Sequence, residues 1–212
     1  FEDRQLSNDC KAAEKKLVKA ASKVYKKFLA SCPAPDAPGS KQVAALMTIT
    51  GLIDAPKADK EFLSINGAQG FSTFYGYYML EAMATAGNYQ GALDVIREYW
   101  GAMIDLGATS FWEDFDINWI PNATPIDELV PEGKKDIHGD CGAYCYVGFR
   151  HSLCHGWASG PTSWLSRHIL GVEVIEPGCR QVRITPHLGD LQWVKGTFPT
   201  PYGEIQIYHE KQ

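Results

Sequence analysis

The chain has 212 residues, of which 45% are hydrophobic and 21% charged, the balance of a folded globular protein. Its formal net charge of −5 disfavours nucleic acid as a partner, because such binding needs a surface that neutralises phosphates. No apolar run is long enough to span a bilayer, and no signal peptide is recognisable at Phe1, so no membrane span is expected. Because the chain lacks an initiator Met, we expect it to be a piece of a longer protein.

The first predicted element is an amphipathic helix over residues 7–29. Apolar residues recur there at steps of three and four, which is the period of one helix face, and lysines occupy the opposite face. The apolar positions are Ala13, Leu17, Ala20, Ala21, Val24 and Phe28. We interpret the lysine-rich face as solvated surface rather than a partner site. Three prolines within residues 32–39 end the helix, since proline removes a backbone donor.

Ser40 is expected to cap a second helix, with Val43, Leu46 and Met47 on its inner face. A third helix, rich in aromatic residues and methionine, is predicted over residues 72–86.

A fourth helix is predicted from Asn88 to a glycine cap at Gly107. The link at Gly87 is so short that the third and fourth helices must run antiparallel. Such a helical hairpin is the repeating unit of helical barrels.

Residues 114–148 lack periodicity, and so long an irregular segment usually covers or lines a site. Helical character returns over residues 152–169, with a break and restart at 159–162. From Gly171 onward the pattern alternates as in strands, with a hairpin turn at residues 201–203. The predicted fold is therefore mainly α with a small, incomplete C-terminal β part.

The main candidate for chemistry is Glu113, which follows Trp112 in the loop after the fourth helix. Aromatic rings stack on the apolar face of a sugar, and a carboxylate activates water or stabilises positive charge at the anomeric carbon. The pair therefore indicates carbohydrate chemistry. The alternative is an aromatic-rich loop with exposed acids, which needs no function.

A metal site is the second possibility weighed, at a cluster of soft ligands within residues 138–155. The cluster comprises His138, Cys141, Cys145, His151, Cys154 and His155. It lacks the Cys-x-x-Cys spacing of structural zinc sites, and the i, i+4 spacing of its first two cysteines favours buried thiols. Asp114 and Asp116 are too few acids for a hard cation. No metal and no cofactor are expected.

Three segments together carry a family resemblance. They are Thr109-Ser-Phe-Trp-Glu113, Ser152-Leu-Cys-His155-Gly-Trp157, and a C-terminal stretch over residues 184–203 that contains Trp-Val-Lys-Gly and Pro-Thr-Pro-Tyr-Gly. From about Phe71 to Ile207 the chain resembles the C-terminal part of bacterial α-L-rhamnosidases of glycoside hydrolase family 78.

The resemblance implies the later helices of an (α/α)6 barrel over residues 1–170 and the start of a β-sandwich over residues 171–212. Such enzymes invert the anomeric centre with two carboxyl groups, one of which protonates the leaving oxygen while the other activates water. The family's general base falls on Glu113 and its sugar-contacting histidine on His155, while Trp112 supports the loop or faces the sugar.

Nothing in the chain matches the family's general acid, which the missing N-terminal part of the parent enzyme is expected to supply. The expected substrate is a rhamnose-containing glycoside or polysaccharide, and the isolated chain is expected to be inactive. A periplasmic or secreted location in a bacterium is favoured over the cytoplasm. Self-association is one way to cover apolar faces left open. Alternatives are a non-catalytic carbohydrate-binding helical module and a zinc-stabilised interaction domain.

Overall fold

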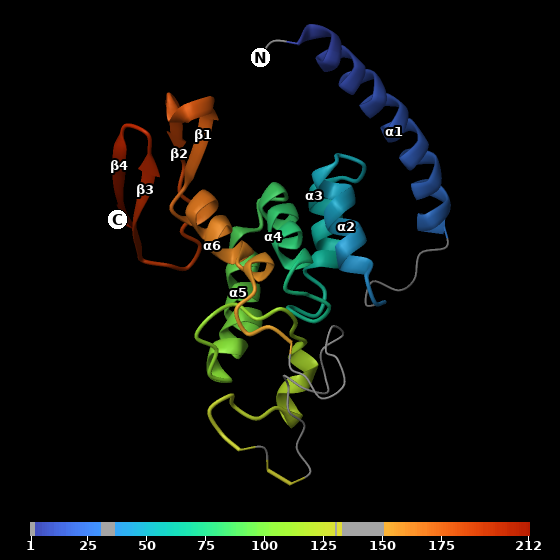
Figure 1. Cartoon of the computed structure of the whole chain (residues 1–212). Coiled ribbons are helices and arrows are strands. Elements are labelled where there is room, and N and C mark those ends of the chain that lie inside the picture. The colour runs from blue at the N-terminus through green and yellow to red at the C-terminus, as the bar shows by residue number, and fades with distance from the viewer. Residues whose placement is uncertain (1–2, 31–36, 130, 133–150) are drawn as a thin grey trace.

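A computed structural model describes residues 3–30, 37–129, 131–132 and 151–212 of the chain. Helices come first and strands last, which confirms a mainly α fold with a C-terminal β part (Figure 1). The helices are α1 (Arg4–Ala30), α2 (Ser40–Ile49), α3 (Ala55–Ala58), α4 (Tyr75–Thr85), α5 (Tyr89–Asp105) and α6 (Gly160–Trp164). The strands are β1 (Val172–Glu176), β2 (Gln181–Ile184), β3 (Trp193–Thr200) and β4 (Gly203–Glu210). Among the helices of the described residues, none combines the length and apolar character needed to cross a bilayer.

Short turns of other helix types extend or link these elements. One π-helical turn, Asp59–Leu63, continues α3, and a second, Leu165–Ile169, continues α6. Turns of 3-10 helix lie at Ile117–Asn122, Gly156–Ala158 and Pro177–Cys179.

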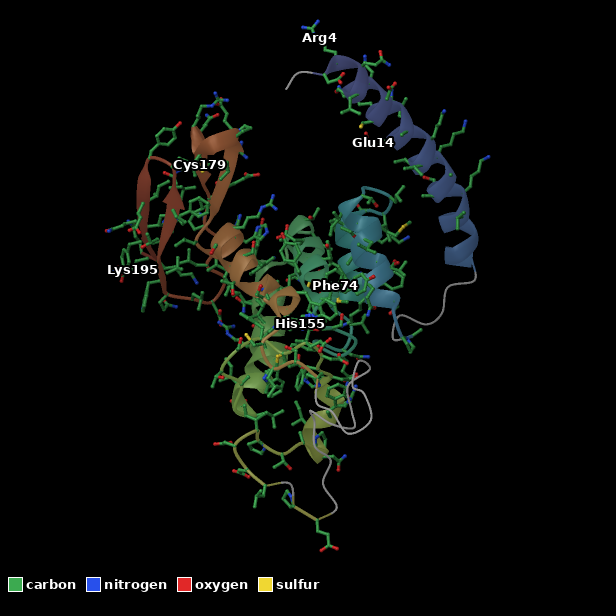
Figure 2. The ribbon with its side chains drawn as sticks, in the orientation of Figure 1. Arg4, Glu14, Phe74, His155, Cys179 and Lys195 are labelled. Atoms are coloured by element: carbon green, nitrogen blue, oxygen red, sulfur yellow. The ribbon has the colours of Figure 1, made fainter. Side chains whose placement is uncertain are left out.

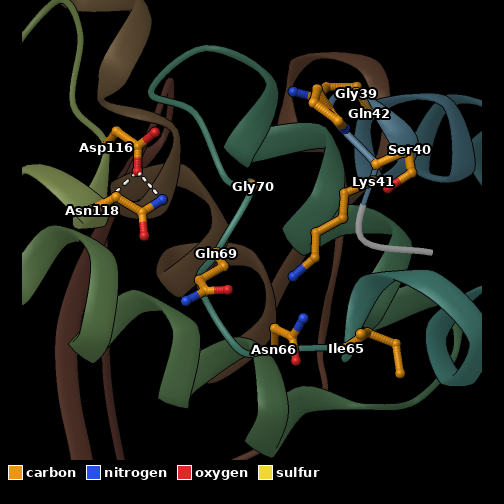
Figure 3. Close-up of a pocket in the computed structure, with 12 residues that line it drawn as sticks. Gly39, Ser40, Lys41, Gln42, Ile65, Asn66, Gln69, Gly70, Asp116 and Asn118 are labelled. Atoms are coloured by element: carbon orange, nitrogen blue, oxygen red, sulfur yellow. Dashed lines mark hydrogen bonds between the residues drawn. The ribbon is translucent and has the colours of Figure 1, made fainter. Parts of the chain in front are cut away.

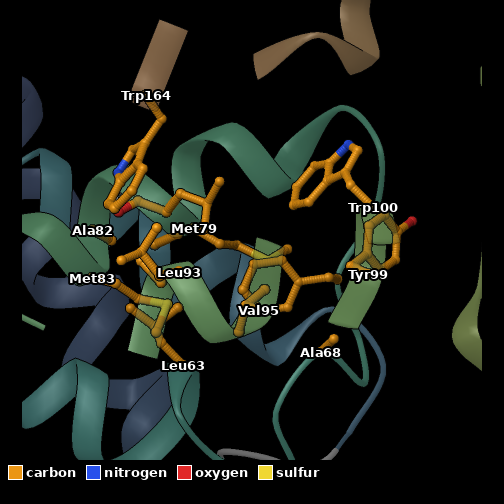
Figure 4. Packing of buried hydrophobic residues seen from close by; sticks show 14 of the residues in the cluster. Leu63, Ala68, Met79, Ala82, Met83, Leu93, Val95, Tyr99, Trp100 and Trp164 are labelled. Atoms are coloured by element: carbon orange, nitrogen blue, oxygen red, sulfur yellow. The ribbon is translucent and has the colours of Figure 1, made fainter. Parts of the chain in front are cut away.

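The main core lies between α4, α5 and α6 (Figure 4). Met79 and Met83 of α4 and Tyr99 of α5 are almost fully buried there, together with Trp164 of α6. The Trp164 indole N–H donates to the carbonyl of Leu80 at 3.0 Å, which satisfies its polar atom inside the core. This packing fixes the end of α5, and the end of α5 carries the loop with Glu113.

The predicted hairpin of the third and fourth helices is confirmed in α4 and α5. A Cβ added to Gly76, at the start of α4, would lie 2.7 Å from Trp100 near the end of α5, so the two helices run antiparallel. Gly87 takes a φ of 80° in the link, and the Asn88 side chain caps α5 by accepting from the Gly91 N–H at 2.9 Å.

The first helix is present as predicted, but its apolar face is not buried. Leu17 and Val24 are 69% and 67% exposed, and the helix stands clear of the rest of the described chain (Figures 1 and 2). The amphipathic pattern therefore forms a helix here without a described surface to pack against.

The predicted inner face of the second helix is wrong. In α2 Val43 and Leu46 are exposed, whereas Lys41 and Ala45 are buried. The physical reason is that the small residues of this face pack against α4, while the Lys41 Nζ donates to the carbonyl of Gly67 at 2.6 Å and so has a partner when buried. Ser40 does not cap the helix either, because the N-cap position is Gly39 in the left-handed region.

The C-terminal strands form two antiparallel hairpins. β1 pairs with β2, and β3 pairs with β4 in a register from Trp193↔Glu210 to Thr200↔Gly203, which confirms the predicted turn at residues 201–203. Leu170, Val172 and Ile207 form a small core between them. The complete barrel, the sandwich and the domain boundary at residue 170 stay predictions.

Candidate active site

The candidate site is built where two loop segments, one before α6 and one after α5, run beside each other. The Glu113 N–H donates to the Ser152 carbonyl, and the His155 N–H donates to the Phe111 carbonyl, both at 2.8 Å. Helical structure was predicted from Ser152, but it begins only at Gly156. The backbone of residues 152–155 is instead used to hold the Glu113 segment.

The two oxygens of the Glu113 carboxylate have different environments. Oε2 accepts a hydrogen bond from the Ser152 N–H at 2.9 Å and lies 3.9 Å from Nδ1 of His155. Within the described residues, Oε1 accepts no hydrogen bond. The side chain is 18% exposed, and one oxygen is held by the backbone while the other accepts no hydrogen bond from the described residues.

The separation of 3.9 Å between Glu113 and His155 is too long for a direct hydrogen bond but suits a bridging water or hydroxyl group. The structure thus brings together the two polar side chains that the sequence had singled out.

The backbone carbonyl of Glu113 is anchored by two donors. The Thr73 hydroxyl donates to it at 2.5 Å, and the Trp157 indole N–H donates to it at 3.0 Å. Thr73 is buried just before α4. Sequence reasoning missed Thr73, because no local pattern marks a threonine whose acceptor lies 40 positions away.

Aromatic rings gather beside the carboxylate and are called the aromatic patch below. The patch consists of the exposed Phe74, Tyr75 and Trp157 and the half-buried Tyr78. Phe74 is its centre, with ring centroids 5.2 Å from Tyr75, 5.8 Å from Tyr78 and 5.7 Å from Trp157. The Trp157 ring also lies 4.3 Å from the His155 ring, which joins the patch to the candidate site (Figure 2 labels Phe74 and His155). Exposed rings next to a carboxylate are suited to stacking on a sugar.

The tryptophans of these segments have different places. Trp112 has no exposed surface and packs against Phe115 in the main core. This position suits a support of the loop rather than a contact with a sugar. Trp164 has no exposed surface and is a packing residue. Trp157 is 39% exposed and its indole N–H donates to the Glu113 backbone, so it belongs to the site.

The two aspartates that were considered as metal ligands make hydrogen bonds to the backbone instead. Asp114 accepts from the Phe115 N–H, and Asp116 caps the following 3-10 turn through Asn118. No group of three or more His, Cys, Asp or Glu side chains within the described ranges is placed to hold a metal ion. His138, Cys141 and Cys145 of the considered zinc cluster lie outside the described residues.

Comparisons with known proteins relate this chain to α-L-rhamnosidases. Residues 171–212 match the family model of the bacterial alpha-L-rhamnosidase C-terminal domain. Among curated proteins, none matches the chain.

Solved structures with a similar fold include the family 78 rhamnosidase of Bacillus sp. GL1, at 27% identity and a TM-score of 0.59 over 80% of this chain. The α-L-rhamnosidase of Aspergillus terreus has a TM-score of 0.60 at 23% identity over 79% of this chain. That of Dictyoglumus thermophilum has a TM-score of 0.58 at 21% identity over 82%.

The chain spans only 16% of the Bacillus structure and 18% of each of the other two. The predicted resemblance to family 78 α-L-rhamnosidases is confirmed, and it places this chain among the relatives of glycoside hydrolases.

Proposed function

From this relationship to the family 78 α-L-rhamnosidases, we propose that the chain carries the general base, Glu113, of an inverting glycosidase that releases terminal α-L-rhamnose. The observation that supports the assignment best is the asymmetric carboxylate, with Oε2 held by the Ser152 N–H and Oε1 accepting no hydrogen bond from the described residues. A general base needs a fixed orientation and direct reach to the water it deprotonates.

In the proposed reaction, water bound at Oε1 attacks the anomeric carbon as its proton passes to the Glu113 carboxylate. The bond between the anomeric carbon and the glycosidic oxygen breaks, and that oxygen takes a proton from a second carboxylic acid. Attack on the face opposite the leaving group inverts the anomeric centre. His155, whose Nδ1 lies 3.9 Å from Oε2, is suited to hold the water or a sugar hydroxyl.

The aromatic patch supports a sugar as the ligand of this site. Phe74, Tyr75 and Trp157 are each about two-fifths exposed although they are large and apolar, and such rings stack on the C–H face of a pyranose. The expected substrate class is a rhamnose-containing glycoside or polysaccharide, which agrees with the description of the solved relatives as rhamnosidases.

The second carboxylic acid is proposed to lie in a part of the parent enzyme beyond this chain, whose residues match only about one sixth of the relatives. Two carboxyl groups roughly 6.5–9.5 Å apart are needed for inversion, so we expect the isolated 212 residues not to hydrolyse an aryl α-L-rhamnoside. The full-length enzyme is expected to release β-L-rhamnose as the first product, measured by proton NMR before mutarotation. Turnover by the isolated chain that disappears in Glu113→Gln would refute the need for a second part, and α-L-rhamnose as the first product would refute inversion.

A non-catalytic carbohydrate-binding helical module is the second candidate, because the aromatic patch needs no second carboxylate to bind a sugar. An intact parent protein that binds rhamnosides but never cleaves them would favour this module.

A further inference from the structure

A pocket of about 250 Å³ lies between the start of α5, the π-helical turn after α6, and the hairpin of β1 and β2 with the segment that leaves it. Besides Tyr89 and Gly171, its lining consists of Arg167, His168, Glu173, Arg183, Thr185 and His187. Neither Glu113, His155 nor any ring of the aromatic patch is part of this described lining. The pocket is therefore separate from the candidate active site.

Three hydrogen-bonding side chains reach the pocket from the segment that leaves β2. Arg183, Thr185 and His187 all line it, as expected for alternate residues of an extended segment. The Thr185 N–H donates to the Gly171 carbonyl at 2.8 Å, and the His187 N–H donates to the His168 carbonyl at 3.0 Å. A Cβ on Gly171 would lie 2.5 Å from the Thr185 backbone, so a glycine is needed for this close approach. The backbone thus fixes where the three side chains begin.

The lining holds two guanidinium groups and one carboxylate. Glu173 lies between them, 3.2 Å from the guanidinium of Arg183 and 3.9 Å from that of Arg167. Arg167 is also bonded to Glu81 and Tyr77 of α4, which do not line the pocket. Arg183 is 62% exposed and pairs, among the described residues, with Glu173 alone. Because a guanidinium has five N–H donors, most of those of Arg183 are available to a ligand.

Charges around the pocket balance only while its histidines are neutral. The two arginines are matched by Glu173 and by Glu81, which also bonds the His168 ring at 3.0 Å. Each proton taken up by a histidine therefore leaves a surplus positive charge. A cationic ligand would find the Glu173 carboxylate already shared between two guanidinium groups, so an anion is the favoured ligand.

His187 is the histidine placed to respond to an anion. Its ring stacks on that of Tyr89, with centroids 3.7 Å apart and an angle of 5° between the planes. Its ring nitrogens make no hydrogen bond with the described residues. Burial, and to a lesser extent the nearby His168, lowers the pKa of the His187 imidazole. An anion beside the ring would favour the protonated form, so anion binding and proton uptake should be coupled.

We propose that this pocket binds a small oxyanion, a phosphate group, whose oxygens accept from the Arg183 guanidinium, the Thr185 hydroxyl and the protonated His187 imidazole. Guanidinium groups match the geometry of phosphate oxygens, and such charge-assisted hydrogen bonds are the strong ones. The Thr185 hydroxyl is exposed and has no hydrogen-bond partner among the described residues, so it is available to donate. The volume is below the range of about 300–1,000 Å³ that holds drug-sized ligands, which suits a small group. The assignment does not require Glu113 to be a base.

A second pocket, at the start of α2, lacks this arrangement (Figure 3). Its Lys41 ammonium group already donates to the Gly67 carbonyl at 2.6 Å, and Asp116 supplies a carboxylate to the lining. An anion would meet that carboxylate without a matching pair of cations. Phosphate should therefore leave the backbone signal of Gly70, which also lines the second pocket, unchanged.

The test is an NMR titration of the full 212-residue chain with inorganic phosphate at constant ionic strength. Phosphate should shift the imidazole signals of His187 and raise the pKa of that ring. Arg183→Gln should raise the dissociation constant of phosphate about tenfold, because it removes charge-assisted hydrogen bonds. The matched control is Arg180→Gln, which should leave the constant unchanged. Arg180 is similarly exposed and pairs with another glutamate of β1, Glu176, at 3.6 Å.

Two further ligands separate the proton and the source of the phosphate. Sulfate keeps its charge between about pH 5.5 and pH 8, the range in which histidine titrates, so it reports the proton on the protein. It should bind more tightly at the lower pH, and His187→Gln should remove most of this pH dependence. Glycerol 3-phosphate distinguishes the sources: tighter binding than inorganic phosphate assigns the site to a phosphate monoester, and weaker binding assigns it to the free ion.

Equal affinity of Arg183→Gln and Arg180→Gln for phosphate would overturn the proposal. So would a pKa of His187 that phosphate leaves unchanged, or equal shifts at Gly70 and along the lysines of α1, which mark non-specific attraction. If Arg183→Gln lowers the melting temperature enough to unfold the chain, Thr185→Val decides. That exposed hydroxyl holds no structural hydrogen bond with the described residues, and its loss should raise the dissociation constant about threefold.

Discussion

The helices α1 and α5 both have an amphipathic sequence but end in opposite environments, since α5 packs with α4 in a hairpin. In α1 large apolar residues such as Leu17 remain exposed, whereas the hairpin buries Met79, Tyr99 and Trp100 against α6. The period of a sequence therefore fixes that a helix forms and which residues share a face. Whether that face is covered depends on partners far away in the chain or beyond it.

The largest expected contrast comes from removing one large apolar side chain from each region. Trp164→Ala should lower the free energy of unfolding by about 3–5 kcal/mol, because it leaves a cavity in the core and removes the hydrogen bond to Leu80. Leu17→Ala should change it by less than about 0.5 kcal/mol, since that side chain is exposed. Urea denaturation of both variants measures the difference. A Leu17→Ala effect comparable to that of Trp164→Ala would mean that α1 is packed in solution, for example by self-association.

A second contrast concerns the buried face of α2 and depends on pH. The pKa of Lys41 is lowered from 10.5 to about 8 by burial, so between these values the folded chain has released a proton that the unfolded chain keeps. Stability should therefore rise with pH across this window, by up to about 3 kcal/mol. The free energy of unfolding at pH 7.5 and pH 10, compared with Lys41→Met, isolates this contribution. A rise of the same size in Lys41→Met would show that another group causes it.

Two glycines of the hairpin should respond to alanine substitution with smaller and opposite changes in stability. Gly76→Ala should destabilise the chain by about 1–3 kcal/mol, because the new Cβ would lie 2.7 Å from the buried Trp100 ring. Gly101→Ala on α5 should stabilise it by up to about 1 kcal/mol, since nothing lies within 4 Å and alanine is the better helix former. Thermal melts of the two variants should therefore shift in opposite directions. A stabilising Gly76→Ala would contradict the close antiparallel packing.

Local signals in the sequence were sufficient for most of the elements. Gly87 and Asn88 mark the hairpin link, Gly107 marks the end of α5, and the alternation after Gly171 marks the strands, because each signal lies within the element it defines. The face of α2 could not be predicted in this way. Lys41 lies on the face that packs against α4, and its ammonium group meets the Gly67 carbonyl from a different segment.

The candidate site also combines residues that could be predicted from the sequence with residues that could not. Glu113 and His155 were found from motifs, and the structure places them 3.9 Å apart. Their supports, the Ser152 N–H and the Thr73 hydroxyl, come from segments 39 and 40 positions away and leave no trace in local composition. Trp157 carries an ambiguous signal, because a tryptophan near a helix start is typical of packing as well as of a sugar site.

The central claim is that Glu113 acts as the general base, and it is tested most directly by steady-state kinetics of Glu113→Gln in the full-length enzyme. With an aryl α-L-rhamnoside, kcat should fall about 100-fold or more, because the amide keeps the shape of the side chain but accepts no proton. The control Glu128→Gln, at an exposed acid in the same irregular region, should keep the parent kcat, and both variants should melt at the parent temperature. A correctly folded Glu113→Gln enzyme with undiminished kcat would contradict the account.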